Sequence, residues 1–442
     1  MTLRQILGSL VVTGALAQAT AAQNYELAEK SRAGDCIQIH LHMTLTGEMR
    51  VTKDDKPISL KLSADAVQDY PERVLTVDDH GMIQKTARTY ETSKAVITVG
   101  SEKSERSLRE ERRLIVAQQY KGQALIYAPS GPLTREEQEL TSEHFDTISL
   151  PGMLPGKAVA IGDSWKIPND VVQALCNFEG LTTQDLSCKL VDVKDNQARV
   201  SVAGSATGID TGALVKLTIQ GNYVIDMKSH RIVSLDWKQK DDRGQGPVSP
   251  ATTVESTTTM TRSATTTPSS LSDVALVSVP DGFQPAASML QLSYHNELKT
   301  RFDLLYAREW QIVGQTRDHS ILRLMDRGDF VAQATISPWA NAKPGEHLSA
   351  DAFREAMAKT PGWQPDEVIQ EGEVPTDRAH YWVYRISAPG RMDGMKVVQT
   401  CYLVAGPGGE QVVLAFTMTP SQAEKLGARD LTLVGGIEFA AK

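Results

Sequence analysis

Apolar and polar residues alternate along much of the first 260 residues, and residues 36–45 show the pattern most strictly. One face of this segment carries polar side chains that include His40 and His42. The other face is wholly apolar: Ile37, Ile39, Leu41, Met43 and Leu45. Strict period-two alternation indicates a half-buried β-strand.

The same pattern continues between residues 191 and 237, where alternating runs are separated by short polar turns at 195–196 and 228–230. Short turns join antiparallel neighbours. After the second turn, Val233, Leu235 and Trp237 are expected to share one face. With one apolar and one polar face, the region predicts a mainly β N-terminal domain, either a large curved antiparallel sheet or an open barrel.

Two short helices interrupt the strand pattern. Thr134 and Glu137 have the spacing of a capping box, in which each side chain binds the other residue's backbone N–H. The second helix is expected over residues 169–177, with Asn169 as its cap and with Val171, Val172 and Leu175 on its buried side.

The composition changes after residue 262. Residues 254–261 are rich in threonine and suit a last strand of the N-terminal domain. The following stretch is rich in Thr, Ser and Pro, which is typical of a linker. The sequence therefore predicts a β-rich domain over residues 23–262, a linker over 263–285 and a second domain over 286–442.

The second domain mixes strands and helices and is expected to be α+β, an antiparallel sheet with packed helices. The turn at residues 326–329 predicts a hairpin. Ser349 is expected to cap a helix, and Leu348 and Phe353 have the spacing of a hydrophobic staple. Further strands are expected at residues 381–386, 397–404 and 411–418, and a final helix from residue 421.

This order of elements resembles the PsbP-like superfamily, which includes LpqN-type bacterial lipoproteins. The likeness rests on the strand FVAQATIS (330–337), the capped helix (349–359), the strand AHYWVY (379–384), and the pair VVQTCYLV (397–404) and QVVLAFTM (411–418). The resemblance implies an antiparallel sheet covered by helices and a non-enzymatic adaptor or assembly role. The N-terminal region resembles uncharacterised secreted bacterial β-rich families.

The N-terminus has the layout of a secretory signal peptide. Arg4 supplies a positive charge, residues 6–17 are apolar, and Ala19-Thr20-Ala21 supplies the small residues of a cleavage site. The apolar run is too short to span a bilayer as a helix. We expect a signal peptide over residues 1–22, a periplasmic or secreted mature protein, and no transmembrane segment after its removal.

The 442 residues include 46 Lys and Arg and 54 Asp and Glu, a net charge of −8. Nucleic-acid-binding domains usually carry a basic patch, so nucleic acid is not an expected partner. The densest basic stretch, residues 106–113 (RSLREERR), contains Glu110 and Glu111 and predicts a solvated strand face. Aromatic residues gather in the second domain, where core packing explains them and an exposed binding groove is the alternative: Trp339, Trp363, Tyr381, Trp382 and Tyr384.

Four cysteines, Cys36, Cys176, Cys188 and Cys401, allow three disulfide connectivities. Cys176 with Cys188 is the favoured pair if a bridge forms, because they lie close together in the sequence. The alternative is four buried thiols, since a free Cys behaves as a small hydrophobe.

Candidate catalytic chemistry is sparse. His40 and His42 could face one metal ion, but a zinc site needs three or four ligands. The helix start already explains Glu136, Glu137 and Glu139. The sequence contains no G-x-S-x-G, H-E-x-x-H, C-x-x-C or phosphate-loop motif. We therefore assign no catalytic, cofactor-binding or metal-binding residue and expect no cofactor.

These observations predict an exported, non-enzymatic binding or assembly protein whose partner is a protein or an apolar small molecule. One alternative is a carrier that holds an apolar ligand in the cup of the N-terminal sheet, since ligand sites are concave and mostly apolar. Another is a metal-dependent enzyme that uses His40 and His42.

Overall fold

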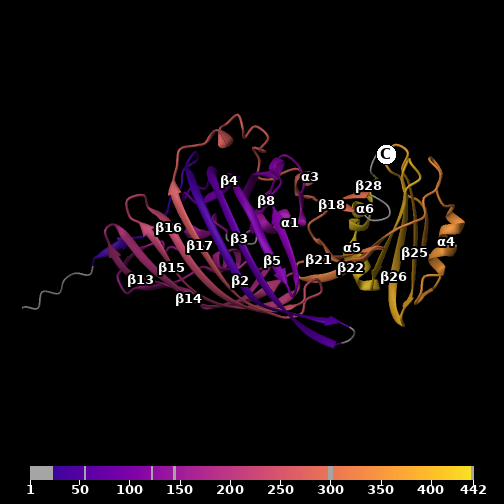
Figure 1. Ribbon diagram of the computed structural model, residues 1–442, viewed down its shortest axis with the longest axis horizontal. Coiled ribbons are helices and arrows are strands. Elements are labelled where there is room, and N and C mark those ends of the chain that lie inside the picture. The colour runs from indigo at the N-terminus through magenta and orange to yellow at the C-terminus, as the bar shows by residue number, and fades with distance from the viewer. Residues whose placement is uncertain (1–22, 54–55, 121–122, 143–145, 297–301, 440–442) are drawn as a thin grey trace, which may run out of the picture.

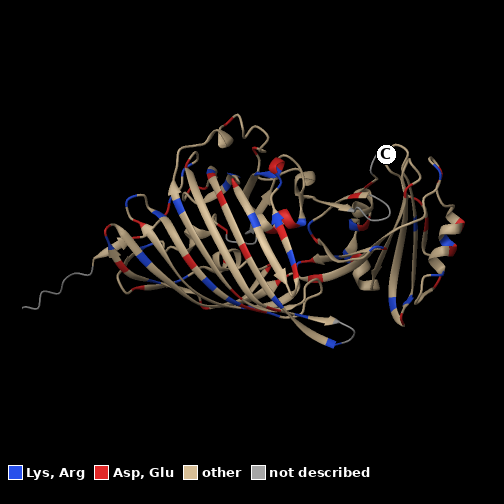
Figure 2. Cartoon of the chain, viewed as in Figure 1, with Lys and Arg blue, Asp and Glu red and all other residues tan. Residues whose placement is uncertain are grey.

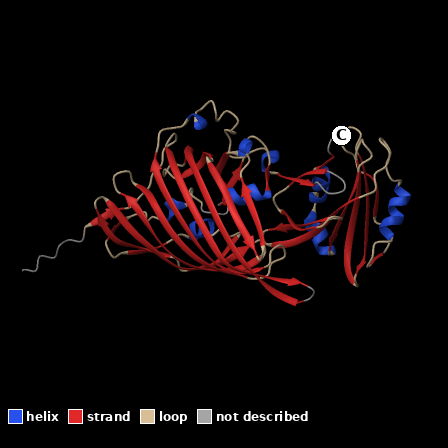
Figure 3. Ribbon diagram, viewed as in Figure 1, coloured by secondary structure: helices blue, strands red, loops and turns tan. Residues whose placement is uncertain are grey.

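The computed structural model describes residues 23–53, 56–120, 123–142, 146–296 and 302–439. The expected signal peptide at residues 1–22 lies outside this range. The described chain is mostly β-strand (Figure 3), with a large curved sheet in the N-terminal part and a smaller sheet at the other end of an elongated molecule (Figure 1). The prediction of a mainly β fold with antiparallel sheets is confirmed.

The large sheet has fourteen strands in the order β11-β13-β14-β15-β16-β17-β2-β3-β4-β7-β8, with β12 beside β14 and the hairpin β5–β6 beside β3. Every neighbouring pair is antiparallel, and in this order β11 and β8 are the two ends, so the sheet is open. The strands are β2 (Cys36–Lys53), β3 (Lys56–Val77), β4 (Ile83–Thr89), β5 (Thr92–Val99), β6 (Glu102–Ser107), β7 (Leu114–Tyr120), β8 (Gln123–Tyr127), β11 (Ser164–Lys166), β12 (Gly180–Gln184), β13 (Ser187–Lys194), β14 (Gln197–Asp210), β15 (Ala213–Asp226), β16 (Arg231–Arg243) and β17 (Ala251–Ala264).

Alternation places the apolar side chains on the concave face, as the sequence predicts. Ile37, Ile39 and Leu41 of β2 are buried, while His40 and His42 between them are exposed. The expectation for Val233 is wrong. A β-bulge in the β15–β16 pairing places Ile225 opposite Ile232 and Val224 opposite Ser234. Ile232 is therefore buried in its place, and Val233 is only half-buried.

Helices α1 (Arg135–Ser142) and α2 (Asn169–Leu175) belong to the same part of the chain, and α1 lies against the β5–β6 hairpin and β8. The capping box of α1 is confirmed: the Thr134 hydroxyl accepts from the Glu137 N–H at 3.2 Å, and the Glu137 carboxylate accepts from the Thr134 N–H at 2.9 Å. The predicted cap of α2 is wrong, because Pro168 occupies the cap position and the Asn169 side chain accepts from Gln184 instead. Val172 and Leu175 are buried as expected, whereas Val171 is only half-buried.

The basic segment 106–113 is not a solvated strand face. β6 ends at Ser107 and a short turn, η1 (Glu110–Arg112), follows. Arg106 binds Glu139 of α1 at 2.7 Å, and Arg109 forms a two-pronged ion pair with the buried Glu137. These arginines attach α1 to the edge of the large sheet.

The segment expected to be a linker packs against the large sheet in part. β17 extends to Ala264, and η3 (Ser269–Leu271) follows. Leu271 is fully buried, and its carbonyl accepts from Arg73 at 2.7 Å. The Gln118 side chain donates to the Phe283 carbonyl at 2.6 Å. A short helix, α3 (Ala287–Leu290), follows the segment.

The C-terminal sheet has the order β20-β21-β22-β27-β26-β25-β23, with β24 also beside β25. One face packs on α4, and α5 and α6 lie on the side toward the large sheet (Figure 1). Its elements are β20 (Trp310–Gln315), β21 (Ser320–Asp326), β22 (Asp329–Pro338), β23 (Trp363–Pro365), β24 (Gln370–Glu373), β25 (Trp382–Met392), β26 (Met395–Ala405), β27 (Gln411–Met418), α4 (Ala350–Ala358), α5 (Pro420–Leu426) and α6 (Arg429–Gly435).

The cap and staple predicted for α4 are both present. The Ser349 hydroxyl accepts from the Ala352 N–H at 3.3 Å. Leu348 packs in the cluster around the buried Phe353. The expected hairpin at residues 326–329 joins β21 to β22. Tyr381 and Val383 pack in the main core, whereas Trp382 and Tyr384 pack under α4, so core packing explains these aromatic residues.

A small third sheet joins the N-terminal and C-terminal parts. Its order is β28-β19-β18-β9, and β9 pairs in parallel with β18 immediately before α1 begins. Its strands are β9 (Leu133–Thr134), β18 (Leu292–Asn296), β19 (Phe302–Tyr306) and β28 (Ile437–Phe439). A separate pair is formed by β1 (Asn24–Glu26) and β10 (Ala158–Ala160), and η2 (Leu150–Met153) precedes β10.

No helix within the described residues is long and apolar enough to cross a membrane. Acidic and basic residues are interspersed along the strands of the large sheet (Figure 2).

Candidate functional site

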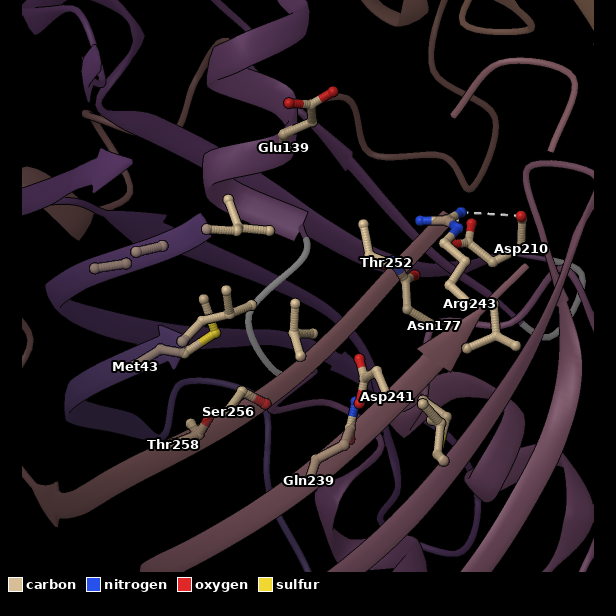
Figure 4. A pocket seen from close by; sticks show the side chains of 18 of the residues that line it. Met43, Glu139, Asn177, Asp210, Gln239, Asp241, Arg243, Thr252, Ser256 and Thr258 are labelled. Carbon is tan, nitrogen blue, oxygen red and sulfur yellow. Dashed lines mark hydrogen bonds and ion pairs between the residues drawn. The ribbon is translucent and has the colours of Figure 1, made fainter. Parts of the chain in front are cut away.

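A cavity of about 410 Å³ lies on the concave side of the large sheet. Strands β2, β3, β5, β15, β16 and β17 form its walls, and residues of α1 and of the end of α2 complete its lining (Figure 4). We call it cavity A. Its volume falls within the range of about 300–1,000 Å³ that is usual for small-molecule sites.

One wall of cavity A is apolar and is built from small residues. Met43 of β2 pairs with Ala66 of β3, and Ala66 pairs in turn with Ala95 of β5. Ala64 repeats this arrangement one step along, between Leu45 and Ile97. Ala66 and Ala95 are buried, whereas Ala64 is half-buried and leaves space in front of its short side chain.

The opposite wall carries a polar stripe along β16. Trp237, Gln239, Asp241 and Arg243 all line the cavity, because they share one face of the strand. On β17 the residues paired with them are Thr258, Ser256, Val254 and Thr252. The inward face of β16 thus changes from apolar to charged along its length.

Asp241 is the titratable group of this stripe with the most perturbed ionisation. Burial raises its pKa to about 6, and the nearby Asp210 carboxylate also raises it, while the Gln239 side chain and the Arg243 guanidinium act in the opposite direction. Its Oδ1 atom is buried and has no hydrogen-bond partner among the described residues. Arg243 does not form an ion pair with Asp241, because its guanidinium is paired with Asp210 and donates to the Thr211 hydroxyl at 2.7 Å.

The helical side of cavity A combines apolar and polar groups. α1 contributes Leu140 and the Glu139–Arg106 ion pair. The end of α2 contributes Cys176 and Phe178. Burial raises the pKa of the Cys176 thiol to about 12, so this cysteine is a neutral thiol at physiological pH and a poor nucleophile.

The structure does not bring the sequence-predicted candidates into one site. His40 and His42 lie on the outer face of β2, and each contacts a different carboxylate of β3, Asp69 and Asp65, at 3.0 Å. Across the described part of the chain, no group of three or more His, Cys, Asp or Glu side chains is arranged to hold a metal ion. Glu136 is exposed, and Glu137 and Glu139 bind arginines of the β6–η1 segment.

The four cysteines are free thiols; three are buried, as the second sequence interpretation expects, and Cys176 is half-buried. Burial raises the pKa of Cys188 and of Cys401 to about 12. Cys36 is also buried.

Sequence reasoning missed the polar stripe. The available signal was the phase of β16: counted from Leu235 and Trp237, the same side of the strand reaches Gln239, Asp241 and Arg243. Charged residues on the inward phase of a strand are unusual, because charges are rarely buried. That departure from the apolar pattern was the feature that could have identified the site.

No protein-family model matches the chain, and no curated protein matches it. Among solved structures, the chain is similar to PsbP of the cyanobacterium Synechocystis sp. PCC 6803, with 12% identity and a TM-score of 0.27 over 36% of this chain and 99% of that one. It is similar to PA94, a protein of unknown function and putative regulator from Pseudomonas aeruginosa, with 14% identity and a TM-score of 0.23 over 34% and 99% of the two chains.

A third similarity is to lipovitellin, with 8% identity and a TM-score of 0.30 over 54% of this chain and 26% of that one. The expected likeness to the PsbP-like superfamily is therefore found as a weak structural similarity over about a third of the chain.

Proposed function

We propose that this protein is a non-enzymatic binding protein that carries a small molecule with an apolar body and a polar end in cavity A. The observation that carries the proposal is the cavity itself, which has an apolar wall on β2, β3 and β5 and a polar stripe on β16. Such a cavity combines mostly apolar lining with a few placed polar groups, which is the usual composition of a ligand site.

The chemistry of the lining favours binding over catalysis. Its thiol, Cys176, has a pKa raised to about 12 by burial. Its hydroxyl groups, on Thr252, Ser256 and Thr258, share the lining with no histidine that could act as a base. The polar stripe is instead suited to hydrogen bonds that orient a ligand, with Gln239 able to donate and accept.

Export belongs to the same proposal. The charge, apolar run and Ala19-Thr20-Ala21 site at residues 1–22 support a periplasmic or secreted location. N-terminal sequencing of the protein made in a bacterial host with an export pathway tests this. A mature N-terminus near Ala22 or Gln23 supports export, and an intact Met1 in the cytoplasmic fraction contradicts it.

Ligand binding can be tested with a neutral apolar fluorophore such as N-phenyl-1-naphthylamine, whose emission rises when it leaves water. Ala64 faces cavity A and is only half-buried. The substitution Ala64→Phe therefore fills the space in front of the apolar wall, and we expect at least tenfold weaker binding.

The matched control is Ser63→Phe, the same side chain one residue away on the exposed outer face of β3. Equal binding by both variants, or no saturable binding by the unmodified protein, would contradict the proposal. Native mass spectrometry of gently purified protein provides a second readout, since a bound lipid-like ligand adds a discrete mass.

A further inference from the structure

A second cavity, of about 450 Å³, lies between the N-terminal and C-terminal parts of the chain, and we call it cavity B. The N-terminal part contributes one side of α1, the end of α2 and residues of β4 and β8, and the C-terminal part contributes residues in and beside the β19–β20 and β21–β22 turns. It adjoins cavity A, because four residues line both: Leu175, Asn177, Phe178 and Asp210.

Three arginines without a carboxylate partner line cavity B. They are Arg135 at the start of α1, Arg308 in the β19–β20 turn and Arg327 in the β21–β22 turn. Within the described ranges, none of the three forms an ion pair. A fourth arginine of the lining, Arg88, is already neutralised by the buried Glu72 at 2.7 Å.

Backbone carbonyls hold two of these guanidinium groups close together. Arg135 donates through Nη2 to the carbonyls of Arg308 and Trp310, each at 2.8 Å. Arg308 donates through Nε to the Leu290 carbonyl at 2.7 Å. Nε of Arg135 and Nη2 of Arg308 are buried and have no partner among the described residues. Carbonyl groups fix both side chains in place but do not cancel their charges.

The electrostatics agree with this geometry. Burial, followed by the repulsion of Arg135, lowers the pKa of Arg308 to about 10. An Arg pKa is ordinarily above 12, so burial and the neighbouring Arg135 guanidinium both disfavour the charged form of Arg308, and the Glu309 carboxylate offsets them only in part.

The carboxylates that line cavity B either bind other groups or face solvent, and among the described residues none of them forms an ion pair with the three arginines. Asp210 is paired with Arg243. Asp146 accepts from the Ile148 N–H and the Ser149 hydroxyl. Glu179 and Glu309 are exposed to solvent. The uncompensated charge therefore remains on the arginine side.

We propose that cavity B is an oxyanion-binding site in which Arg135 and Arg308, with Arg327 at the rim, hold a carboxylate or phosphate group. Guanidinium forks match the geometry of both groups and bind them by charge-assisted hydrogen bonds. The site goes beyond the role of cavity A and can be tested without it. Two sources supply such an anion: a free small anion, or the head group of an amphiphile whose tail reaches into cavity A.

The test is isothermal titration calorimetry of the purified full-length protein with inorganic phosphate, acetate, decyl phosphate, decanoate and decanol. We expect phosphate or carboxylate compounds to bind and decanol not to bind at cavity B. Similar affinities for inorganic and decyl phosphate identify a free anion, and much tighter binding of decyl phosphate identifies a head group.

Arg308→Met keeps the length of the apolar stem and removes the charge, and should weaken anion binding at least tenfold. Arg308→Lys keeps the charge but lacks the forked guanidinium, so its anion affinity should lie between that of the unmodified protein and that of Arg308→Met. The control is Arg317→Met, since Arg317 is exposed in the β20–β21 turn. Phosphate should raise the thermal midpoint of the unmodified protein and of the control but not that of Arg308→Met.

The proposal is overturned if no anion binds at 10 mM, or if Arg308→Met binds anions as the unmodified protein does while circular dichroism shows both to be folded. Loss of fluorophore binding in Ala64→Phe tests cavity A alone. If Ala64→Phe loses fluorophore binding but still binds anions, the proposal for cavity B stands independently of the proposal for cavity A.

Discussion

Removing one partner of the buried ion pair between Glu29 and Arg262 should strongly destabilise the large sheet. The two side chains are 2% and 0% exposed. They meet in two parallel hydrogen bonds, Nη1 to Oε2 at 3.0 Å and Nη2 to Oε1 at 2.7 Å. The Ile232 N–H also donates to Glu29, and the Ile232 carbonyl accepts from Arg262. The pair thereby fastens the N-terminal segment to β16 and β17.

The substitution Glu29→Gln keeps the shape of the side chain and removes its charge, which leaves the Arg262 guanidinium buried without a counter-charge. Removing one partner of a buried ion pair costs about 3–5 kcal/mol. Replacing both partners by apolar residues of similar volume is often close to neutral. We therefore expect Glu29→Gln to be severely destabilised and the double variant Glu29→Leu/Arg262→Met to recover most of that loss.

The assay is urea unfolding followed by tryptophan fluorescence, with the midpoint and slope recorded for each single variant, the double variant and the unmodified protein. Glu105→Gln is the matched control, because Glu105 pairs with Lys103 at 2.8 Å on the exposed strand β6. Exposed ion pairs contribute little, so this control should leave the midpoint unchanged. The reasoning fails if Glu29→Gln costs less than about 1 kcal/mol, or if the double variant is as unstable as the two single losses added together.

Three further predictions follow from single groups. The folded-state pKa of Asp241, about 6, lies above its usual 3.8, so the ionised carboxylate lowers the free energy of unfolding above pH 6 and this loss disappears as the pH falls toward 4. At pH 7.5, Asp241→Asn should therefore raise the thermal midpoint and add about 1–2 kcal/mol to the free energy of unfolding. At pH 4 the same substitution should change neither. Thr134→Ala removes the hydroxyl of the α1 capping box and should cost about 1 kcal/mol in urea unfolding, whereas Thr134→Ser should cost much less. Cys176, whose pKa burial raises to about 12, should resist iodoacetamide at pH 8 in the folded protein and react after denaturation, and rapid labelling of the native protein would contradict the assignment.

Local patterns in the sequence were sufficient for local structure. The alternation of residues 36–45, the capping box of Thr134 and Glu137, and the Ser349 cap each depend on neighbours within a few positions, and each is present. The local prediction was wrong where a partner distant in sequence competed. The Asn169 side chain accepts a hydrogen bond from Gln184 and does not cap its own helix. The β-bulge that leaves Val233 unpaired opposite Val224 and Ile225 likewise has no signature in the turn at residues 228–230.

The candidate site was largely beyond prediction because it depends on strands distant in sequence. β17 lies beside β2, so Thr258 pairs with Met43 across more than two hundred residues. Arg106 and Glu139, which a sequence reader assigns to solvent, meet only because α1 folds onto the β5–β6 hairpin. The cup-shaped sheet could be predicted from alternation, whereas the occupants of its concave face could not.

The parallel pairing of β9 with β18 has a mechanical consequence. β9 consists of Leu133 and Thr134, and α1 begins at the next residue. The helix that lines cavity A is therefore attached, with no slack, to a strand of the C-terminal part. Any displacement of the four-stranded sheet would therefore move α1, and with it the side of cavity A that Glu139 and Leu140 form.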